Sequence, residues 1–433
     1  MSEGEDRDAA GAALRSPRGT HDVLPPESAR WEALITRFAA LAERHGYGLA
    51  HTPIFEDARL FRRGMGDASE VVRKEMYEFE DRSGRHLALR PEGTAPIVRA
   101  FVQHHPPVPW RVWYLTPAFR YEQAQAGRYR QHHQLGAEVL GTDDPDVDVE
   151  LIALAHDLYA EIGLTRYRLG ITSLGDQVCR PAYLEALTAY LETVEDKLCD
   201  EHRETWRRNP LRVLDCKREA CRAATEGAPV LREWLCDACR AHLERVQTGL
   251  SAAGIAWEAD DRLVRGLDYY TRTTFEFTGT ALEAASNAIG GGGRYDLLAE
   301  AIGGPHTPGI GFGAGIERIL LACDAEGAFD IAPPSAQAFV VDVTGGAAAR
   351  DLVLALRRRG VRAERAYDDR SMKAQLRAAD RSGARVAVIV GPSELEAGTV
   401  VVRDLVAGSQ RTEPVEALLA RASATGSVEE PTP

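Results

Sequence analysis

The sequence lacks any hydrophobic run of the roughly 18 to 20 residues that a membrane span needs. Its first stretch, MSEGEDRDAAGAALRS, is acidic and has no apolar core, so it does not resemble a secretory signal peptide. The seven cysteines are an odd number in a long chain of 433 residues, which favours free thiols in a reducing compartment over a disulfide framework. These absences predict a cytoplasmic protein that does not enter a membrane.

Positive charge is scarce overall, because 52 Lys and Arg face 65 Asp and Glu and the formal net charge is −13. That balance argues mildly against a nucleic-acid partner unless positive charge is concentrated locally. Residues 350–385 provide such a concentration, with eleven Lys or Arg, five Asp or Glu and a net charge of +6. A basic patch of this kind suits a phosphate backbone, although a solvated helical face has the same composition.

The length of the chain exceeds what one hydrophobic core serves, so we expect two or three domains. Hydrophobic residues make up 44% and charged residues 27%, as in ordinary globular proteins. The polar ends, 1–16 and 425–433, are expected to be disordered tails. The proline pair before Ser335 reads as a linker, which separates a region over 17–330 from a second region over 335–424.

Apolar periodicity predicts the main elements. Helical spacing covers 27–45 and 146–162, and strand patterns cover 76–79, 110–115, 134–140, 167–171 and 273–278. A strand over 49–55 would contain Pro53, which suits a sheet edge that needs a partner or a cover. From 335 onward strands at 339–343, 361–366, 386–390 and 400–405 alternate with helices at 347–359, 371–380 and 414–421, so we expect a small α/β sheet there.

A polar loop joins the strands at 110–115 and 134–140. It carries Arg120, Glu122, Arg128 and Arg130, with Gln131 and Gln134 after them. Arginine offers a planar fork that fits phosphate or carboxylate. A solvated hairpin crossed by ion pairs is the alternative interpretation.

Glycine is concentrated in two later segments. The run Gly290 to Gly293 is either a flexible turn or a place where the backbone approaches a ligand closely. From Gly309 to Gly315 glycine alternates with apolar residues, which leaves one strand face bare for a flat group, and Arg318 follows at the head of a helix. Upstream, Arg265 lies among apolar neighbours, so it either forms a salt bridge or meets an anionic ligand.

Two close cysteine pairs occur between 175 and 254. Cys216 and Cys221 are followed by Cys236 and Cys239. This spacing is compatible with a tetrahedral structural zinc site, and the alternative is four ordinary thiols on helices. Neither interpretation gives these cysteines a catalytic role.

Several motifs together resemble those of a known family. LRPEGT and FRYEQ…GRYRQHHQLGAEV resemble the second signature motif of class II aminoacyl-tRNA synthetases, HTPIFE the end of the first, and GIGFGAGIER the third. LVRGLDYYTRTTFEF resembles the peptide peculiar to histidyl-tRNA synthetases. RSMKAQLRAAD, ARVAVIVGPSE and GTVVVRDL resemble the anticodon-binding domain of that family. The resemblance runs from Arg18 to about Leu320 and resumes in the last hundred residues.

The resemblance implies an α+β fold. The expected parts are a class II antiparallel-sheet catalytic domain over 17–330, a helical insertion within it over 175–254, and a small α/β anticodon-binding domain over 335–424. It also implies a homodimer and an ATP-dependent ligase, which activates L-histidine with ATP and Mg²⁺ and transfers it to the 3′ end of a tRNA.

The resemblance assigns roles to particular residues. Arg120 would hold the α-phosphate and the histidine carboxylate, and Arg265 would face it in place of a metal ion. The residues expected to bind histidine are Glu92, Gly93, Thr94, Arg120, Gln134, Glu138, Arg265, Tyr269, Tyr270 and Tyr295. Those expected to bind ATP are Arg120, Glu122, Arg128, Gly311, Gly313 and Arg318.

Two alternatives share the same core. A catalytically silent regulatory subunit of ATP phosphoribosyltransferase senses histidine, but it lacks the anticodon domain and has an eroded histidine peptide. A stress-sensing RNA-binding module derived from a synthetase is the other. Both the histidine peptide and the anticodon-domain motifs are intact in this sequence.

Overall fold

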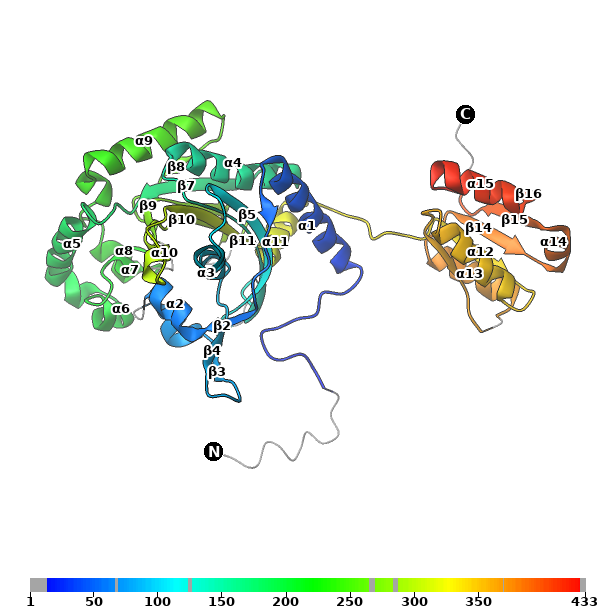
Figure 1. Cartoon of the computed structure of the whole chain (residues 1–433), viewed down its shortest axis with the longest axis horizontal. Helices are drawn as coiled ribbons and strands as arrows, with labels where there is room; N and C mark the ends of the chain where they lie inside the picture. Colours follow the sequence, from blue (N-terminus) through cyan, green and yellow to red (C-terminus); the bar gives the residue numbers. More distant parts are fainter. Residues whose placement is uncertain are drawn as a thin grey trace. The chain divides into compact units, whose positions relative to one another are not determined.

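The computed structural model describes residues 14–66, 69–123, 127–264, 269–282, 287–368 and 370–428. The chain divides into two compact units, Met1–Ile331 and Ala332–Pro433 (Figure 1). Among the described helices, none is both long enough and apolar enough to cross a membrane.

The larger unit is built on an eight-stranded sheet with the strand order β1-β5-β6-β11-β10-β9-β7-β8. Its strands are β1 (Gly48–Leu49), β5 (Trp110–Phe119), β6 (Gln131–Leu140), β7 (Tyr167–Ser173), β8 (Glu258–Ala259), β9 (Thr271–Gly279), β10 (Ala288–Arg294) and β11 (Gly309–Gly315). The six central strands pair antiparallel, and only the short edge strands β1 and β8 pair parallel to their neighbours. The expected antiparallel sheet is therefore present.

A smaller sheet with the order β2-β4-β3 lies in the same unit, formed by β2 (Phe55–Asp57), β3 (Glu78–Glu80) and β4 (His86–Leu89). The strand predicted over 49–55 is wrong in its middle, because β1 ends at Leu49 and β2 begins at Phe55. Nη1 of the buried Arg90 donates hydrogen bonds to the carbonyl oxygens of Thr52 and Pro53, at 3.0 and 3.2 Å. Carbonyls bound in this way, beside a proline that lacks an N–H, do not join a strand ladder.

Helices cover both faces of the large sheet. They are α1 (Glu27–Arg44), α2 (Ala58–Met65), the π-helix η1 (Val71–Glu75), α3 (Thr94–His104), α4 (Pro145–Glu161), α10 (Leu298–Ala301) and α11 (Ile316–Glu326). Between β7 and β8 come α5 (Arg180–Val194), η2 (Glu195–Lys197), α6 (Asp200–Thr205), α7 (Leu211–Leu214), α8 (Glu219–Ala224), η3 (Leu231–Trp234) and α9 (Asp237–Ala252). The sheet bends around α3, while α4 and α9 lie on its other side (Figure 1).

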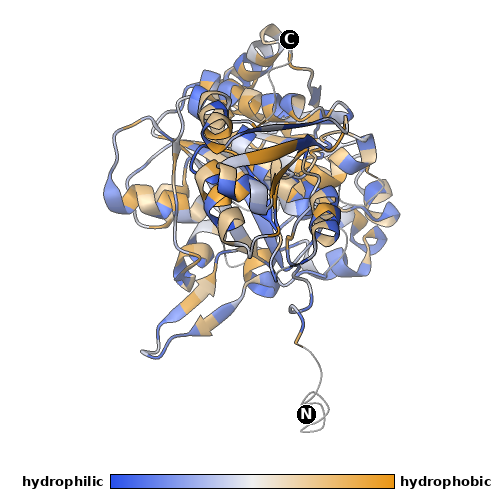
Figure 2. Cartoon of the chain, turned by 90° about the vertical axis from the view of Figure 1, so that its right-hand side faces the viewer, coloured by the Kyte–Doolittle hydropathy of each residue, from blue (hydrophilic) through white to orange (hydrophobic). Residues whose placement is uncertain are grey.

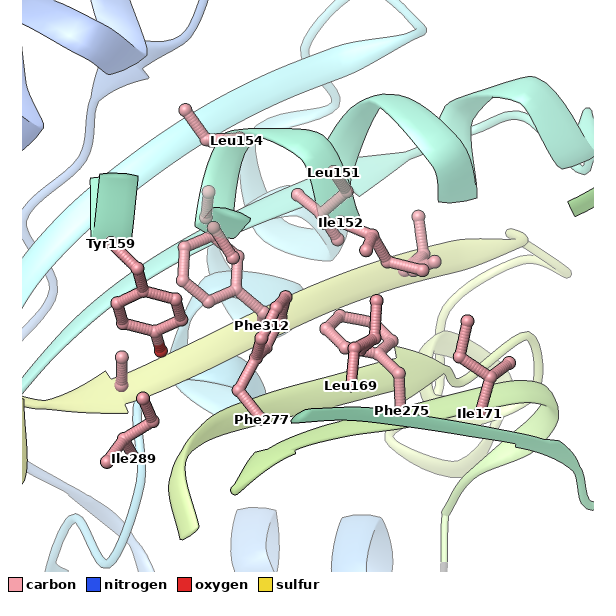
Figure 3. Packing of buried hydrophobic residues seen from close by; sticks show 14 of the residues in the cluster. Leu151, Ile152, Leu154, Tyr159, Leu169, Ile171, Phe275, Phe277, Ile289 and Phe312 are labelled. Atoms are coloured by element: carbon pink, nitrogen blue, oxygen red, sulfur yellow. The ribbon is translucent and has the colours of Figure 1, made fainter. Parts of the chain in front are cut away.

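The side of the sheet that faces α4 is apolar. Leu135, Ala137 and Val139 alternate along β6 and lie in the main core, as the sequence pattern predicted. Phe275 and Phe277 of β9 and Phe312 of β11 meet side chains of α4 there (Figure 3). Each such side chain contributes about 1.5–3 kcal/mol when fully buried. Because strand residues alternate between faces, β6 turns its polar residues to the opposite face.

The smaller unit has a five-stranded sheet with the order β13-β12-β14-β15-β16. Its elements are β12 (Ala338–Asp342), α12 (Ala347–Arg357), β13 (Ala363–Arg365), α13 (Met372–Arg381), β14 (Val386–Val390), α14 (Pro392–Ala397), β15 (Thr399–Asp404), β16 (Gln410–Pro414) and α15 (Val415–Thr425). Its strands β12 and β14 are rich in apolar residues, and its helices carry blue and orange bands in Figure 2, as expected for helices with one apolar side.

The small α/β sheet predicted after residue 335 is confirmed, with two elements that the sequence did not reveal. Strand β16 alternates between exposed and half-buried residues at the sheet edge, so it has no apolar pattern. Helix α14 spans six residues and has no buried residue, so it lacks the periodicity that would have predicted it.

Candidate active site

Glu138 lies at the centre of a closed polar cluster on the large sheet. It is fully buried on β6, and its Oε1 accepts hydrogen bonds from Thr94 Oγ1 at 2.8 Å and Tyr114 OH at 3.0 Å. Its Oε2 accepts a hydrogen bond from Tyr295 OH at 2.6 Å. Burial raises the pKa of Glu138 to about 8, although the hydroxyl donors act in the opposite direction. The residue is therefore a carboxyl group held by donors from α3, β5 and the segment after β10.

Glycines on β11 leave room for this cluster. A Cβ atom on Gly311 would lie 1.5 Å from Glu138 Oε2, and one on Gly313 would lie 1.7 Å from Gln134 Nε2. The strand face that was predicted to be bare is therefore occupied by two side chains of the neighbouring strand β6, Glu138 and Gln134.

The glycine run at 290–293 is not a flexible turn, because it lies within β10. A Cβ on Gly292 would lie 1.9 Å from the carbonyl oxygen of Gly311. Glycine lets β10 and β11 approach each other where a side chain would not fit.

The loop before α3 presents polar groups to the same region. Both carboxylate oxygens of the buried Glu92 accept backbone hydrogen bonds, from Thr94 N at 2.6 Å and from Ala95 N at 2.8 Å. Gln134 Oε1 accepts one from Gly93 N at 3.2 Å. Burial raises the pKa of Glu92 against the lowering effect of these bonds and of Arg120. The predicted residues Glu92, Gly93, Thr94 and Gln134 therefore lie together.

Three tyrosines complete this side of the cluster. The ring centroid of Tyr269 lies 4.8 Å from that of Tyr270 and 5.8 Å from that of Tyr295. All three residues are buried, and burial raises the pKa values of Tyr269 and Tyr295 well above 10. The hydroxyl groups of Tyr269 and Tyr295 therefore stay protonated at neutral pH and can donate hydrogen bonds.

Arginines from the loop between β5 and β6 gather beside the cluster. Arg120 Nε donates a hydrogen bond to the carbonyl of Pro91 at 2.8 Å, which anchors the guanidinium group one residue from Glu92. Glu122 lies 4.0 Å from Arg120 Nη1 and 3.7 Å from Arg128 Nε. Arg128 Nε is buried without a hydrogen-bond partner among the described residues. Arg128 thus lies beside a carboxylate and still has a buried donor that suits an anionic ligand.

Arg318 joins the same group from the start of α11. It donates to the carbonyl oxygens of Gly127 and Ala288, each at 3.0 Å. Burial lowers its pKa, and the positive charges of Arg128 and Arg120 act in the same direction. The predicted ATP-binding arginines thus share one region. Arg265, the predicted partner of Arg120, falls outside the described residues.

Sequence reasoning missed two buried groups. Tyr114 donates to Glu138, and it faces a glycine on the neighbouring strand, since a Cβ on Gly136 would lie 2.3 Å from the Tyr114 ring. An isolated glycine in a strand signals such a close approach.

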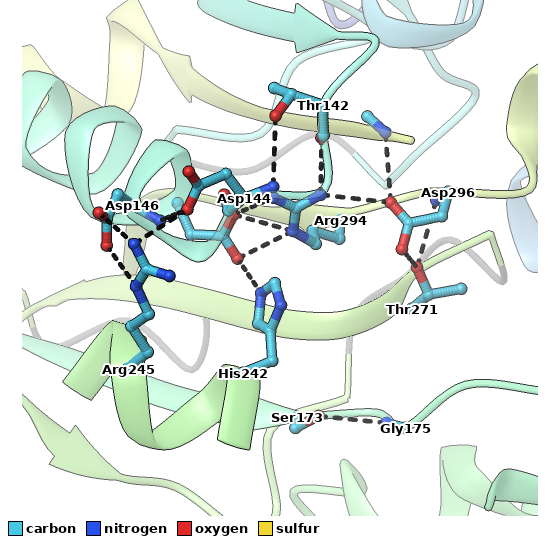
Figure 4. Close-up of polar contacts among 12 residues, drawn as sticks. Thr142, Asp144, Asp146, Ser173, Gly175, His242, Arg245, Thr271, Arg294 and Asp296 are labelled. Atoms are coloured by element: carbon cyan, nitrogen blue, oxygen red, sulfur yellow. Dashed lines mark hydrogen bonds and ion pairs between the residues drawn. The ribbon is translucent and has the colours of Figure 1, made fainter. Parts of the chain in front are cut away.

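The second missed group is centred on Arg294 at the end of β10 (Figure 4). This arginine is fully buried and lies 2.6 Å from the buried Asp148 of α4. Asp148 also lies 2.8 Å from His242 Nε2 of α9. Arg294 donates further bonds to the carbonyls of Thr142 and Asp144. The sequence shows the arginine but not its partners, which lie far away in the chain.

The predicted four-cysteine zinc site is wrong. Cys216 and Cys221 gather with Cys199 and His202, whereas Cys236 and Cys239 gather with Asp176 and Cys179. The first pair lies at α7 and α8, and the second lies at the start of α9. Spacing alone paired the cysteines nearest in sequence and overlooked the partners supplied by the entry to α5 and by α6.

The large antiparallel sheet with an arginine-bearing loop between neighbouring strands, followed by a small α/β unit, has the organisation of a class II aminoacyl-tRNA synthetase. Residues 19–319 match the family model described as histidyl-tRNA synthetase, and residues 334–425 match the anticodon binding domain. The chain therefore belongs to the histidyl-tRNA synthetase family.

Individual relatives agree with this family. The chain is 48% identical over 410 residues to a histidine–tRNA ligase from Moorella thermoacetica, covering 93% of this chain and 96% of that protein. The crystal structure of apo S. aureus histidyl-tRNA synthetase superposes with a TM-score of 0.80 at 34% identity, covering 94% of this chain and 99% of that one. A Bacillus halodurans protein described as an ATP phosphoribosyltransferase regulatory subunit/histidyl-tRNA synthetase has a TM-score of 0.64 at 20% identity and covers 87% of this chain and 99% of that one, which shows the fold alone.

Proposed function

We propose that this chain is a histidine–tRNA ligase that forms histidyl-adenylate from L-histidine and ATP and then transfers the histidyl group to the 3′ end of its cognate tRNA. The observation that carries this function is the buried Glu138 cluster beside Arg120, Arg128 and Arg318. The cluster offers hydrogen bonds of both kinds, and the arginines offer positive charge for phosphates.

Histidine fits the polar cluster chemically. A neutral imidazole has one hydrogen-bond donor and one acceptor. We assign the ring to Glu138 and Tyr270, with Tyr269 and Tyr295 beside it. We assign the histidine ammonium group to Glu92, Gly93, Thr94 and Gln134. Analogues that leave such buried groups unpaired would be rejected by about 10⁴-fold or more.

Activation joins two anions, since the histidine carboxylate attacks the α-phosphorus of ATP and pyrophosphate leaves. Catalysis then depends on positioning and on stabilising the phosphate oxygens with positive charge. We assign Arg120 to the carboxylate and the α-phosphate, with Arg265 facing it. The assignment of Arg265 is supported by the family-specific peptide that contains it. Adenine and the outer phosphates are assigned to Glu122, Arg128, Gly311, Gly313 and Arg318.

Mg²⁺ would neutralise the β- and γ-phosphates when bound with ATP. The residues present fit this ion. The negative charges of Glu122 and Glu276 both raise the pKa of Arg318, so the two carboxylates lie in the same region. Carboxylate oxygens are ligands that Mg²⁺ prefers, and the remaining ligands would come from phosphate and water.

We assign tRNA reading to the smaller unit. A hollow of about 390 Å³ there is lined by Arg350, Arg365, Tyr367 and Arg370, among others. Tyr367 is 61% exposed, and the Arg365 guanidinium lies 4.6 Å from the centre of its ring. An exposed aromatic ring among arginines suits an unstacked base and its phosphate.

We also propose that the chain forms a homodimer in the cytoplasm, where tRNA charging supplies translation. The dimer is supported by apolar side chains exposed around the edge strands β1 and β2. Leu49, Ile54 and Phe55 are 52, 46 and 52% exposed. Exposed apolar side chains next to an open strand edge need a cover.

The decisive experiment separates activation from charging. Histidine-dependent exchange between ATP and pyrophosphate should occur in the full chain and should survive deletion of the smaller unit from Ala332, whereas tRNA charging should be lost. Exchange should not occur with the other standard amino acids. Histidine binding without exchange would favour the regulatory-subunit alternative. Equal loss of both activities in a folded truncation would contradict a separate tRNA-reading unit.

A further inference from the structure

The two thiol clusters lie apart from the residues assigned to catalysis. We call Cys199, His202, Cys216 and Cys221 the imidazole cluster, and Asp176, Cys179, Cys236 and Cys239 the carboxylate cluster. In each cluster four potential ligand atoms, one per residue, lie within 4.8 Å of one another. Six of the seven cysteines of the chain are gathered in this way, and all seven are free thiols.

The imidazole cluster has the dimensions of a tetrahedral zinc site. Zinc–sulfur bonds of about 2.3 Å place tetrahedral sulfur ligands about 3.8 Å apart. His202 Nδ1 lies 3.2 Å from Cys199 Sγ and 3.9 Å from Cys221 Sγ. Cys216 and Cys221 are buried, and Cys199 and His202 are half-buried. Three sulfurs and one imidazole nitrogen form a ligand set that structural zinc uses.

Neighbouring groups support a charged, metal-bound state of these thiols. The Cys199 backbone N–H donates to Cys221 Sγ at 3.3 Å, and Arg218 hydrogen-bonds the Cys199 side chain. Three thiolates and one divalent ion would carry one net negative charge beside the Arg218 guanidinium group, which also lies 3.3 Å from Glu201 Oε2. Such outer contacts orient metal ligands and tune the site.

The local fold also needs a cross-link. Cys199 and His202 lie at the start of α6, Cys216 in the turn between α7 and α8, and Cys221 in α8, and α6, α7 and α8 span six, four and six residues. Helices this short are not stable alone. Figure 1 shows the three helices grouped on one side of the larger unit. A metal ion bound by all four ligands would hold this lobe together.

We propose that the imidazole cluster binds one structural zinc ion, which fixes the short helices α6 to α8 within the insertion. The assignment concerns folding of this lobe, and it leaves histidine activation to the residues already described.

A separate observation supports a second ion in the carboxylate cluster. Asp176 Oδ1 lies 3.5 Å from Cys179 Sγ and 3.9 Å from Cys236 Sγ. Arg272 Nη2 lies 3.7 Å from the other oxygen of Asp176, which offsets part of the negative charge. Cys179 precedes α5 and Cys236 precedes α9, so an ion here would join the entry and the exit of the helical segment.

The carboxylate cluster is also connected to the histidine site. Arg180 follows Cys179 and donates to the carbonyl of Tyr270 at 2.5 Å, and the backbone N–H of Arg272 donates to the carbonyl of Gly175 at 2.8 Å. Loss of this second ion should therefore raise the KM for histidine. Loss of the first should change this KM less, because, among the contacts of the described residues, α7 and α8 reach the segment before Tyr270 only through Arg262, which donates to the Leu214 carbonyl at 3.1 Å and to Thr225 Oγ1 at 2.9 Å.

The test is metal analysis of the full-length protein purified without added metal or chelator. We expect about two zinc ions per chain in the wild type and about one each in Cys216→Ser and Cys239→Ser. The matched control is Cys323→Ala, which removes a buried thiol of α11 outside both clusters and should retain both ions. In the wild type, titration with a mercurial reagent should release the zinc in step with thiol modification, which tests the site even where a variant fails to fold.

Each outcome decides the matter. Less than a few tenths of an equivalent of zinc in the wild type overturns both sites, and iron in place of zinc overturns the choice of metal. One zinc ion that is lost in Cys216→Ser but kept in Cys239→Ser overturns the second site alone. Zinc that is equally reduced in Cys323→Ala would show that its loss does not report on these ligands.

Discussion

The two largest of the described sheets differ in how they use most of their polar residues. The region of the eight-stranded sheet buries Glu138, Glu92 and Arg294 within hydrogen-bond networks, and Gly311 on β11 leaves room for Glu138. The five-stranded sheet packs mainly valine and alanine inside and leaves Arg350, Tyr367 and Arg370 at a surface hollow.

The difference follows from the size of the ligands we assign. A small amino acid can be enclosed by buried groups, which gives selectivity. A folded RNA is too large to enclose and is met at a surface. Substitutions in the large sheet should therefore affect stability and activation, and those in the small sheet should affect charging alone.

The largest effect on stability is expected for Arg294→Met. Removing the guanidinium group leaves Asp148 buried without its cation, which costs about 3–5 kcal/mol. The matched control is Arg245→Ala on α9, because Arg245 pairs with Asp146 at 2.6 Å but both side chains are more than half exposed. That change should cost less than about 1 kcal/mol. Urea unfolding measures both, and equal losses would contradict a special role for the buried pair.

Glu138→Gln should change how stability depends on pH. The folded-state pKa of about 8 lies above the unfolded value of 4.5, so between these limits the folded chain holds a proton that the unfolded chain has released. The stability of the wild type should therefore fall as pH rises, by about 4 kcal/mol between pH 5 and pH 8. The glutamine variant has no such group and should gain on the wild type over this range. Unfolding at several pH values measures the difference, and parallel curves would contradict the raised pKa.

Arg265→Ala should lower adenylate formation by about 10²-fold or more, because one preorganised cation is lost from the developing phosphate charge. Its effect on tRNA binding should be small. Exchange of pyrophosphate into ATP measures it. A variant within about twofold of wild type would show that this arginine is not at the α-phosphate.

Gly311→Ala should weaken histidine binding, since the added Cβ would lie 1.5 Å from Glu138 Oε2 and displace the carboxyl group. Leaving a buried hydrogen-bonding group without its partner costs about 1–3 kcal/mol, so the KM for histidine should rise by about fivefold or more. Gly315→Ala on the same strand is the control, because a Cβ there would come no closer than 3.9 Å to its nearest neighbour, Arg318 Cγ. Similar kinetics for the two variants would place Glu138 outside the histidine site.

Tyr367→Ala should have the smallest effect, a loss of about 1–3 kcal/mol in tRNA binding, if one base stacks on the ring. Histidine-dependent exchange should not change. Leu395→Ala, an exposed residue of α14 away from the hollow, provides the control. A normal KM for tRNA in Tyr367→Ala would remove this hollow from the proposed tRNA surface.

Local patterns in the sequence predicted many of the longer elements and, for some of them, the face that is buried. Alternation at Leu135, Ala137 and Val139 predicted strand β6, and helical spacing at Trp31, Leu34 and Phe38 predicted α1. Motifs predicted a synthetase site on Glu92, Arg120 and Glu138. These signals are readable because periodicity and motifs are properties of neighbouring residues.

Contacts between distant segments were decided only by the tertiary structure. The sequence contains no pattern that pairs Arg294 with Asp148, which lies 146 residues away in the chain. The cysteine spacing suggested one site that contains both Cys216 and Cys236, whereas the fold places Cys216 beside His202 and Cys236 beside Asp176, in separate clusters. A buried charge or a thiol takes whichever partner the packed chain brings within bonding distance, and that partner is set by the arrangement of whole helices and strands.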